Sequence, residues 1–241
     1  LSAAVTLGRA WQLLSDDKKS SALPVANEDG TLYGMLSRED VASYNMDLVF
    51  NGFLEEVPLF NVLSVLEGKV LNEAGENTDS IGGEVTIALP KSRENLLFSS
   101  PKTVVLCGHQ PDMIRRALEL GVSCLVLCQA ELEEDLRRLP TTTCIISTPF
   151  DAYSAARLIF QSTPVGRICR RKDLVCFHLA DRVDEVREQV LKYREHCYPI
   201  LDEEERVVGV LTRYHLLRPR RKRVVLVDHN EAAQSVPGLD E

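Results

Sequence analysis

The hydrophobic positions of this chain follow two different spacings. Near the N-terminus, Leu7, Ala10 and Leu14 lie three or four residues apart. The same spacing recurs far downstream at Val183, Val186 and Val190. Residues at this spacing share one face of an α-helix, so both segments are predicted to be amphipathic helices.

Between these two helices, continuous apolar runs alternate with helical segments. The predicted strands are residues 82–89, 103–107, 122–128 and 142–147. The predicted helices are residues 58–68, 111–121, 131–139 and 150–160. This alternation favours a parallel sheet that helices cover on both faces.

The strongest internal signal is a repeat. SALPVANEDGTLYGMLSREDV (21–41) aligns without a gap with HCYPILDEEERVVGVLTRYHL (196–216), at a constant offset of 196 − 21 = 175. In each copy an apolar strand and a polar turn lead to a second strand that ends in a hydroxyl residue, Ser37 or Thr212. That residue is predicted to be the N-cap of a helix. A unit of about 50 residues is too small to bury both of its faces, so we expect the two copies to pack together.

This repeat resembles the CBS domain, two of which form a pair. The ending Gly-apolar-apolar-Ser/Thr-x-x-Asp is complete in GMLSRED (34–40), whereas GVLTRYH (209–215) has His215 at the aspartate position. The resemblance implies that the hydroxyl residue contacts nucleotide phosphate or ribose and that the aspartate binds ribose hydroxyls. Ribose recognition in the second copy is therefore left open.

The predicted nucleotide-binding site lies between the two copies and consists of Ser37, Arg38, Asp40, Thr212, Arg213 and Tyr214. Arg38 and Arg213 follow the hydroxyl residue at equivalent positions, where both can face phosphate. Tyr214 can stack on an adenine ring. The competing interpretation is that these are surface residues at the start of a helix.

The segment between the copies resembles the DRTGG domain, a small α/β unit found beside CBS domains. The resemblance rests on the order of elements and their position, because Cys128-Gln129-Ala130 stands where the family tends to have Thr-Gly-Gly. It implies a mostly structural role, including dimer contacts, and no site residues. The loop CGHQPD (107–112) precedes a helix N-terminus, where anions can bind, but His109 is interpreted as a loop residue.

Composition narrows the class of protein. The chain of 241 residues has a formal charge of −8, which argues against general nucleic-acid binding. The sequence contains no apolar run of membrane-spanning length and no signal peptide, and its seven cysteines follow no disulfide framework. We therefore expect a cytoplasmic location. Cys124 and Cys128 are interpreted as buried apolar residues in preference to a metal pair. Because the chain begins with Leu1, we expect it to be a piece of a longer protein.

The last residues carry the candidate metal chemistry. The basic run RPRRKR (218–223) is either a solvated linker or an electropositive rim near a phosphate site. VVLV (224–227) is predicted to be a buried strand with Asp228 at its C-terminal end, where ligands bind in open α/β sheets. A carboxylate at such a place suits Mn²⁺ or Mg²⁺. The string LVDHNEAAQS (226–235) resembles the Asp-His-Asn-Glu motif of family II inorganic pyrophosphatases, members of the DHH phosphoesterase superfamily.

This second resemblance implies a parent enzyme, because a CBS–DRTGG–CBS insert before the motif is the architecture of the family's nucleotide-regulated subgroup. It implies that Asp228 is a metal ligand in the full-length enzyme, with Mn²⁺ or Mg²⁺ in the catalytic domain. It also implies inhibition by AMP or ADP and activation by ATP or diadenosine polyphosphates. The family's other metal-binding motifs do not occur in the sequence, so we expect no catalytic residues and no enzyme activity in this fragment. The expected partners are a second copy in a homodimer and the catalytic domains of the same chain.

The predicted fold class is α/β with α+β CBS units, that is, a CBS pair with an inserted DRTGG-like parallel α/β domain. The predicted boundaries are 1–50 for the first CBS domain, 51–67 for a helical linker, 68–166 for the DRTGG-like domain, 167–218 for the second CBS domain, and 219–241 for a linker and the start of the catalytic segment. Two alternatives stay open. One is a structural dimerisation module with empty CBS sites, and the other is a phosphoesterase in its own right or part of another DHH-type enzyme.

Overall fold

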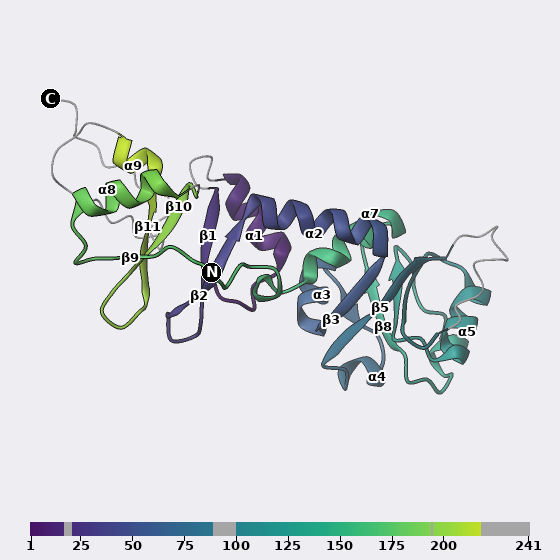
Figure 1. Cartoon of the computed structure of the whole chain (residues 1–241). Coiled ribbons are helices and arrows are strands. Elements are labelled where there is room, and N and C mark those ends of the chain that lie inside the picture. Colours follow the sequence, from purple (N-terminus) through teal and green to yellow (C-terminus); the bar gives the residue numbers. More distant parts are fainter. Residues whose placement is uncertain (17–20, 89–99, 194, 218–241) are drawn as a thin grey trace, which may run out of the picture.

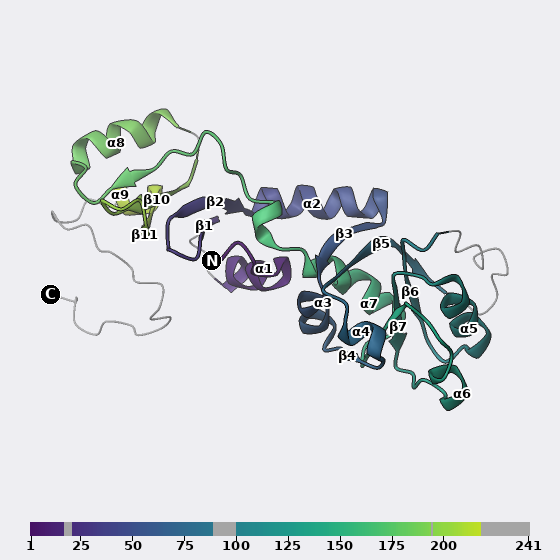
Figure 2. The same ribbon diagram turned by 90° about the horizontal axis from the view of Figure 1, so that it is seen from below.

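The computed structural model describes residues 1–16, 21–88, 100–193 and 195–217. Three units lie in a row (Figure 1). The first repeat copy is in the middle, the second copy is on one side, and the inserted α/β domain is on the other. The view turned by 90° shows the same order (Figure 2). The basic run at 218–223 and the segment that contains Asp228 lie outside the described residues.

The two repeat copies have the same local structure. The first copy consists of α1 (Leu7–Asp16), β1 (Ala22–Ala26), β2 (Leu32–Ser37) and α2 (Arg38–Asn51). The second consists of β9 (Phe177–His178), α8 (Val183–Lys192), β10 (Cys197–Leu201), β11 (Val207–Thr212) and α9 (Arg213–Leu217). The buried face of α1 is the predicted one, Leu7, Ala10 and Leu14. In α8 the prediction is confirmed for Val186 and Val190 but wrong for Val183, which is 47% exposed because it lies at the helix start.

The two hairpins repeat each other down to the irregularity in their pairing. In the first, Ala22 pairs with Ser37, and the register shifts between Val25 and Ala26. In the second, Cys197 pairs with Thr212, and the register shifts between Ile200 and Leu201. These positions are related by the offset of 175 found in the sequence. The two copies therefore share the same strand pairing as well as the same pattern of apolar residues.

Hydrogen bonds between the copies show an approximate twofold symmetry. The Leu32 amide donates to the Glu205 carbonyl at 3.2 Å, and the Val207 amide donates to the Gly30 carbonyl at 3.0 Å. The two bonds are equivalent under the repeat, because Leu32 corresponds to Val207 and Gly30 corresponds to Glu205 at the offset of 175. A small shared core of Ala22, Met35 and Cys197 lies between the hairpins. The expectation that the two copies pack together is confirmed.

The inserted domain is a six-stranded sheet in the order β3-β5-β6-β7-β8-β4. Its elements are β3 (Phe53–Pro58), α3 (Leu59–Leu66), β4 (Lys69–Val70), α4 (Glu73–Glu76), β5 (Ser80–Ile87), β6 (Thr103–Cys107), α5 (Pro111–Leu120), β7 (Cys124–Cys128), α6 (Glu134–Arg137), β8 (Cys144–Thr148) and α7 (Ala152–Ile159). Strands β5 to β8 are parallel, while β3 and β4 pair antiparallel at the two edges. The predicted parallel α/β domain is confirmed, with antiparallel edge strands added.

The central strands are buried on both faces, as their continuous apolar runs predict. Val104 and Leu106 of β6 point into the core that α3 and α7 cover. Val105 and Cys107, which alternate with them, belong to the core on the opposite face, under α5 and α6. Gly121 ends α5 with a φ of 64°, which is the left-handed conformation that a helix-terminating glycine supplies.

The predicted helical linker at 51–67 is the main correction to the domain organisation. Residues 53–58 form β3, an edge strand of the six-stranded sheet, and only α3 is helical there. The register shifts between Leu54 and Val57, so two exposed glutamates separate the two buried residues. This irregular pairing removes the strict alternation by which a half-buried strand is recognised in a sequence.

Candidate nucleotide-binding cleft

The turn that follows β2 is a closed network of hydrogen bonds. The Ser37 hydroxyl accepts from the Asp40 amide at 3.1 Å, as expected of an N-cap residue. In return, Asp40 Oδ2 accepts from the Ser37 amide and from the Ser37 hydroxyl, both at 2.7 Å. This reciprocal arrangement is a capping box in which aspartate takes the place of the usual glutamate. It holds the Asp40 carboxylate at the start of α2.

The equivalent turn of the second copy has a histidine in place of that carboxylate. The Thr212 amide donates to His215 Nδ1 at 3.3 Å, and the Thr212 hydroxyl lies 3.2 Å from the same nitrogen. His215 therefore reproduces the geometry of Asp40 with an imidazole. The two turns have the same shape and differ in charge.

Both predicted phosphate-facing arginines contact the ends of preceding helices in the structure. Arg38 Nη2 donates to the Leu14 carbonyl near the end of α1. Arg213 Nη2 donates to the Val190 carbonyl at 3.2 Å and to the Tyr193 carbonyl just beyond α8. A cation at the C-terminus of a helix satisfies carbonyl groups that have no partner within the helix. Their role in binding phosphate stays a prediction.

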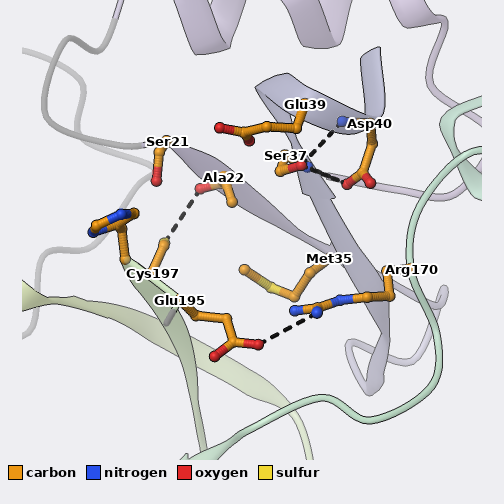
Figure 3. A pocket seen from close by; sticks show the side chains of 10 residues that line it. Ser21, Ala22, Met35, Ser37, Glu39, Asp40, Arg170, Glu195 and Cys197 are labelled. Atoms are coloured by element: carbon orange, nitrogen blue, oxygen red, sulfur yellow. Dashed lines mark hydrogen bonds and ion pairs between the residues drawn. The ribbon is translucent and has the colours of Figure 1, made fainter. Parts of the chain in front are cut away.

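A cleft lies between the two copies, beside the first capping turn (Figure 3). Its volume is about 410 Å³, and its lining residues are Ser21, Ala22, Met35, Ser37, Glu39, Asp40, Arg170, Glu195, His196 and Cys197. The first copy supplies one wall, and residues 195–197 of the second copy supply the other. This volume lies within the range of small-molecule sites.

Of the six predicted site residues, Ser37 and Asp40 line this cleft. Arg38, next to them in the chain, is directed to α1. Thr212, Arg213 and Tyr214 belong to the equivalent turn of the second copy and do not line it. The Tyr214 side chain is 46% exposed, and its ring lies edge-on to that of His215 with 6.4 Å between centroids.

The sequence analysis missed five polar residues of the cleft, which are Ser21, Glu39, Arg170, Glu195 and His196. Arg170 lies near the start of the predicted second CBS domain, ahead of β9 and outside the aligned repeat of residues 196–216. Its amide donates to the Met35 carbonyl at 2.8 Å, and the Met35 amide donates to the Arg170 carbonyl at 2.9 Å. Such a pairing between distant parts of the chain leaves no local pattern. Glu195 and His196 adjoin the repeated Cys197, which is the one signal that could have pointed to them.

Cys124 and Cys128 are buried residues of the core, as predicted. Cys124 and Cys128 lie on β7 and are at most 4% exposed. Burial raises the pKa of the Cys128 thiol to about 12, and that of Cys107 likewise to about 12, so both are protonated at neutral pH. Within the described ranges, no group of three or more His, Cys, Asp or Glu residues could hold a metal ion. None of the helices described there is both long and apolar enough to cross a membrane.

Two protein-family models match this chain, one over the two repeat copies and one over the inserted domain. The CBS domain model matches residues 1–47 and 165–221, and the DRTGG domain model matches residues 61–162. The chain therefore contains CBS and DRTGG domains. The two CBS matches are the two repeat copies, and the DRTGG match is the inserted α/β domain.

Two curated relatives are inorganic pyrophosphatases. The cobalt-dependent inorganic pyrophosphatase of Clostridium perfringens is 32% identical over 100% of this chain and 44% of its own length. A probable manganese-dependent inorganic pyrophosphatase of Thermotoga maritima is 28% identical over 78% of this chain and 34% of its own length. The chain therefore spans less than half the length of the curated relatives it matches.

A solved structure matches nearly the whole chain. It is the crystal structure of the CBS and DRTGG domains of the regulatory region of Clostridium perfringens pyrophosphatase, complexed with the activator diadenosine tetraphosphate. The match has 28% sequence identity and a TM-score of 0.75, and it covers 88% of this chain and 94% of that one. The CBS–DRTGG chain described here thus closely matches a regulatory region of known structure.

Proposed function

We propose that this chain is the regulatory, adenine-nucleotide-binding region of a metal-dependent inorganic pyrophosphatase. The observation that carries the proposal is the match to nearly all of a pyrophosphatase regulatory region whose structure contains diadenosine tetraphosphate. The two curated pyrophosphatases support the identity of the parent enzyme. In this proposal AMP or ADP inhibits the parent enzyme, and ATP or a diadenosine polyphosphate activates it.

The geometry of the cleft supports nucleotide binding by the CBS pair. The capping turn at Ser37 presents the start of α2, whose amides and dipole favour an anion. Asp40 offers a carboxylate that can accept from ribose hydroxyls. The cleft volume of about 410 Å³ is sufficient for one nucleoside. A sugar and a phosphate can therefore each find a partner of suitable chemistry.

We expect a mononucleotide to prefer the first half of the CBS pair. Asp40 is an anionic acceptor, whereas the equivalent His215 offers one imidazole nitrogen, which already faces Thr212. A ligand with two adenosines can use both equivalent turns, because the approximate twofold symmetry relates them. Tyr214 beside the second turn is exposed and can stack on a base.

Calorimetric titration of the 241-residue chain with AMP, ADP, ATP and diadenosine tetraphosphate tests the proposal. Asp40→Asn keeps a side chain that can cap α2 but removes the anionic acceptor for ribose. It should weaken AMP binding by about 1.5–3 kcal/mol, the range for hydrogen bonds to charged groups. Asp151→Asn is the matched control, because Asp151 also caps a helix, α7, but lies in the DRTGG domain.

The absence of binding heat or thermal stabilisation with all four nucleotides would favour the structural alternative, a dimerisation module with empty CBS sites. The observation that supports this alternative is that His215 occupies the position where the CBS family usually has an aspartate. A third possibility, a phosphoesterase activity of the chain itself, requires Mn²⁺-dependent release of phosphate that Asp228→Ala abolishes. Asp228 lies outside the described residues, so its role as a metal ligand of the parent enzyme is proposed from the motif alone.

A further inference from the structure

An ion pair spans the cleft between the CBS copies. Arg170 Nη1 lies 3.3 Å from Glu195 Oε1. Figure 3 shows the two side chains meeting beside Met35, with Ser37 and Asp40 on the far side of the same cleft. The Arg170 side chain is 46% exposed and that of Glu195 is 26% exposed, so both can be reached by a ligand in the cleft.

The backbone of Arg170 is fixed independently of this pair. Its amide and carbonyl both bond to Met35 on β2, which places the residue on the wall formed by the first copy. Glu195 comes from the second copy, just before β10. The guanidinium can therefore change its partner by side-chain rotation alone, without a change in the backbone that carries it.

The other carboxylates of the cleft disfavour a phosphate group. Glu39, Asp40 and Glu195 all line it. The Asp40 carboxylate accepts a hydrogen bond from Ser37 and is suited to bind a ribose. The Glu195 carboxylate instead forms an ion pair with Arg170 in the same cleft. A phosphate that enters has to approach a guanidinium and displace a carboxylate from it.

We propose that Arg170 is the phosphate-binding cation of this cleft and that Glu195 is a specificity residue that competes with ligand phosphate for it. The inference rests on the proposed nucleotide-binding function and adds to it a defined phosphate site. Arginine binds phosphate and carboxylate through the same pattern of N–H donors, so the two anions are direct competitors. Because the ion pair is partly exposed, the competition reduces phosphate affinity by no more than about fivefold.

The test compares adenosine, which has no phosphate, with AMP, ADP and ATP by calorimetry on the whole chain. Glu195→Gln should tighten the three phosphorylated ligands by up to about fivefold and leave adenosine unchanged. Arg170→Gln should weaken AMP by about tenfold or more and leave adenosine unchanged. Arg170→Lys, which keeps the charge, should retain part of the AMP affinity. In the Arg170→Gln background, the gain from Glu195→Gln should shrink.

Glu204→Gln is the matched control, because Glu204 also pairs with an arginine, Arg206 Nη2 at 2.6 Å, but does not line the cleft. It should change neither adenosine nor AMP affinity. Equal changes for adenosine and AMP in the Glu195 and Arg170 variants would overturn the inference, since the pair would then only hold the two copies together. Unchanged AMP affinity in a folded Arg170→Gln chain would overturn it as well. If the unmodified chain binds no adenine nucleotide, the proposed function fails and the inference falls with it.

Discussion

Replacing Arg213 by alanine should destabilise the second CBS copy in the absence of any ligand. The guanidinium donates to two carbonyl groups at the end of α8, those of Val190 and Tyr193. Alanine removes both bonds and the favourable charge at the helix C-terminus. The equivalent Arg38 makes the same kind of contact to α1 in the first copy. We therefore expect Arg213, which the sequence predicts to bind phosphate, to contribute mainly to the stability of the fold.

The magnitude follows from these contacts. A hydrogen bond from a charged donor contributes about 1.5–3 kcal/mol when buried, and a cation at a helix C-terminus adds about 0.3–1 kcal/mol. Because the bond to Tyr193 is exposed, we take the lower end and expect a loss of about 2 kcal/mol in the free energy of unfolding. For a unit of about 100 residues, this lowers the melting temperature by about 8 °C or more.

The assay is thermal unfolding followed by circular dichroism, first without nucleotide and then with AMP. Arg138→Ala is the control, because that arginine is largely exposed and pairs with Glu134 on the DRTGG surface. A large loss of stability without AMP, with little further loss of AMP-induced stabilisation, confirms the structural role. An unchanged melting temperature without nucleotide, together with weaker AMP binding, would refute it and return Arg213 to the phosphate site.

Three further predictions concern single side chains. Tyr214→Ala should weaken ligands that contain adenosine by about 1–3 kcal/mol through lost stacking, and calorimetry should show no change for pyrophosphate. His215→Asp should raise the melting temperature by a few degrees, because a carboxylate accepts more strongly from Thr212, and it should strengthen diadenosine polyphosphate binding by supplying a second ribose acceptor. Asp151→Ala should lower the urea midpoint at pH 7. Hydrogen bonds donated by Ser154 and Tyr153 hold the pKa of Asp151 below its ordinary value, so the stabilisation is lost as the pH falls through that lowered pKa. At such a low pH the urea midpoint of Asp151→Ala should equal that of the unmodified chain.

The fold was largely predictable because its two main signals are local. The repeat aligns at one offset, and the structure reproduces that offset in the strand register and even in the position of the register shifts. The continuous apolar runs of β6, β7 and β8 identified strands buried on both faces, and the helices between them followed from their terminal residues. Pro111 at the start of α5 and Gly121 at its end are examples of such residues.

What escaped prediction depends on contacts between distant residues. The sequence predicts a linker where β3 lies, because the irregular register of this strand places Glu55 and Glu56 between two buried positions. The site is predicted at two hydroxyl turns, but only the turn at Ser37 lines the cleft, and the arginine that lines it is Arg170, which pairs through its backbone with Met35. Neither arginine beside a turn lines the cleft, because each has a carbonyl partner at a helix end. The sequence motif identifies the two turns, but it does not reveal the direction in which the side chains of Arg38 and Arg213 point.

A ligand bound in the cleft as proposed would contact the segments that connect the first CBS copy to the DRTGG domain. The first CBS copy and the DRTGG domain are joined by two chain segments. One is α2, which begins at Arg38 beside the capping serine and leads directly into β3. The other runs from α7 through Val165–Arg167 to Arg170, and it is bonded to the first copy on the way.

Both connecting segments therefore touch the cleft at residues with a proposed role in binding. A ligand that contacts Ser37 and Arg170 holds the start of one segment and the end of the other. The Tyr44 hydroxyl on α2 lies 2.8 Å from the Thr163 hydroxyl, so the two segments also contact each other between the cleft and the sheet. Contacts of this kind can carry the effect of differential binding at the cleft to a neighbouring packed unit. Exchange of the Arg170–Glu195 ion pair for a bound phosphate would remove one contact between the segment that ends at Arg170 and residues 195–197 of the second copy, so the ligand would act directly on the packing of the two copies.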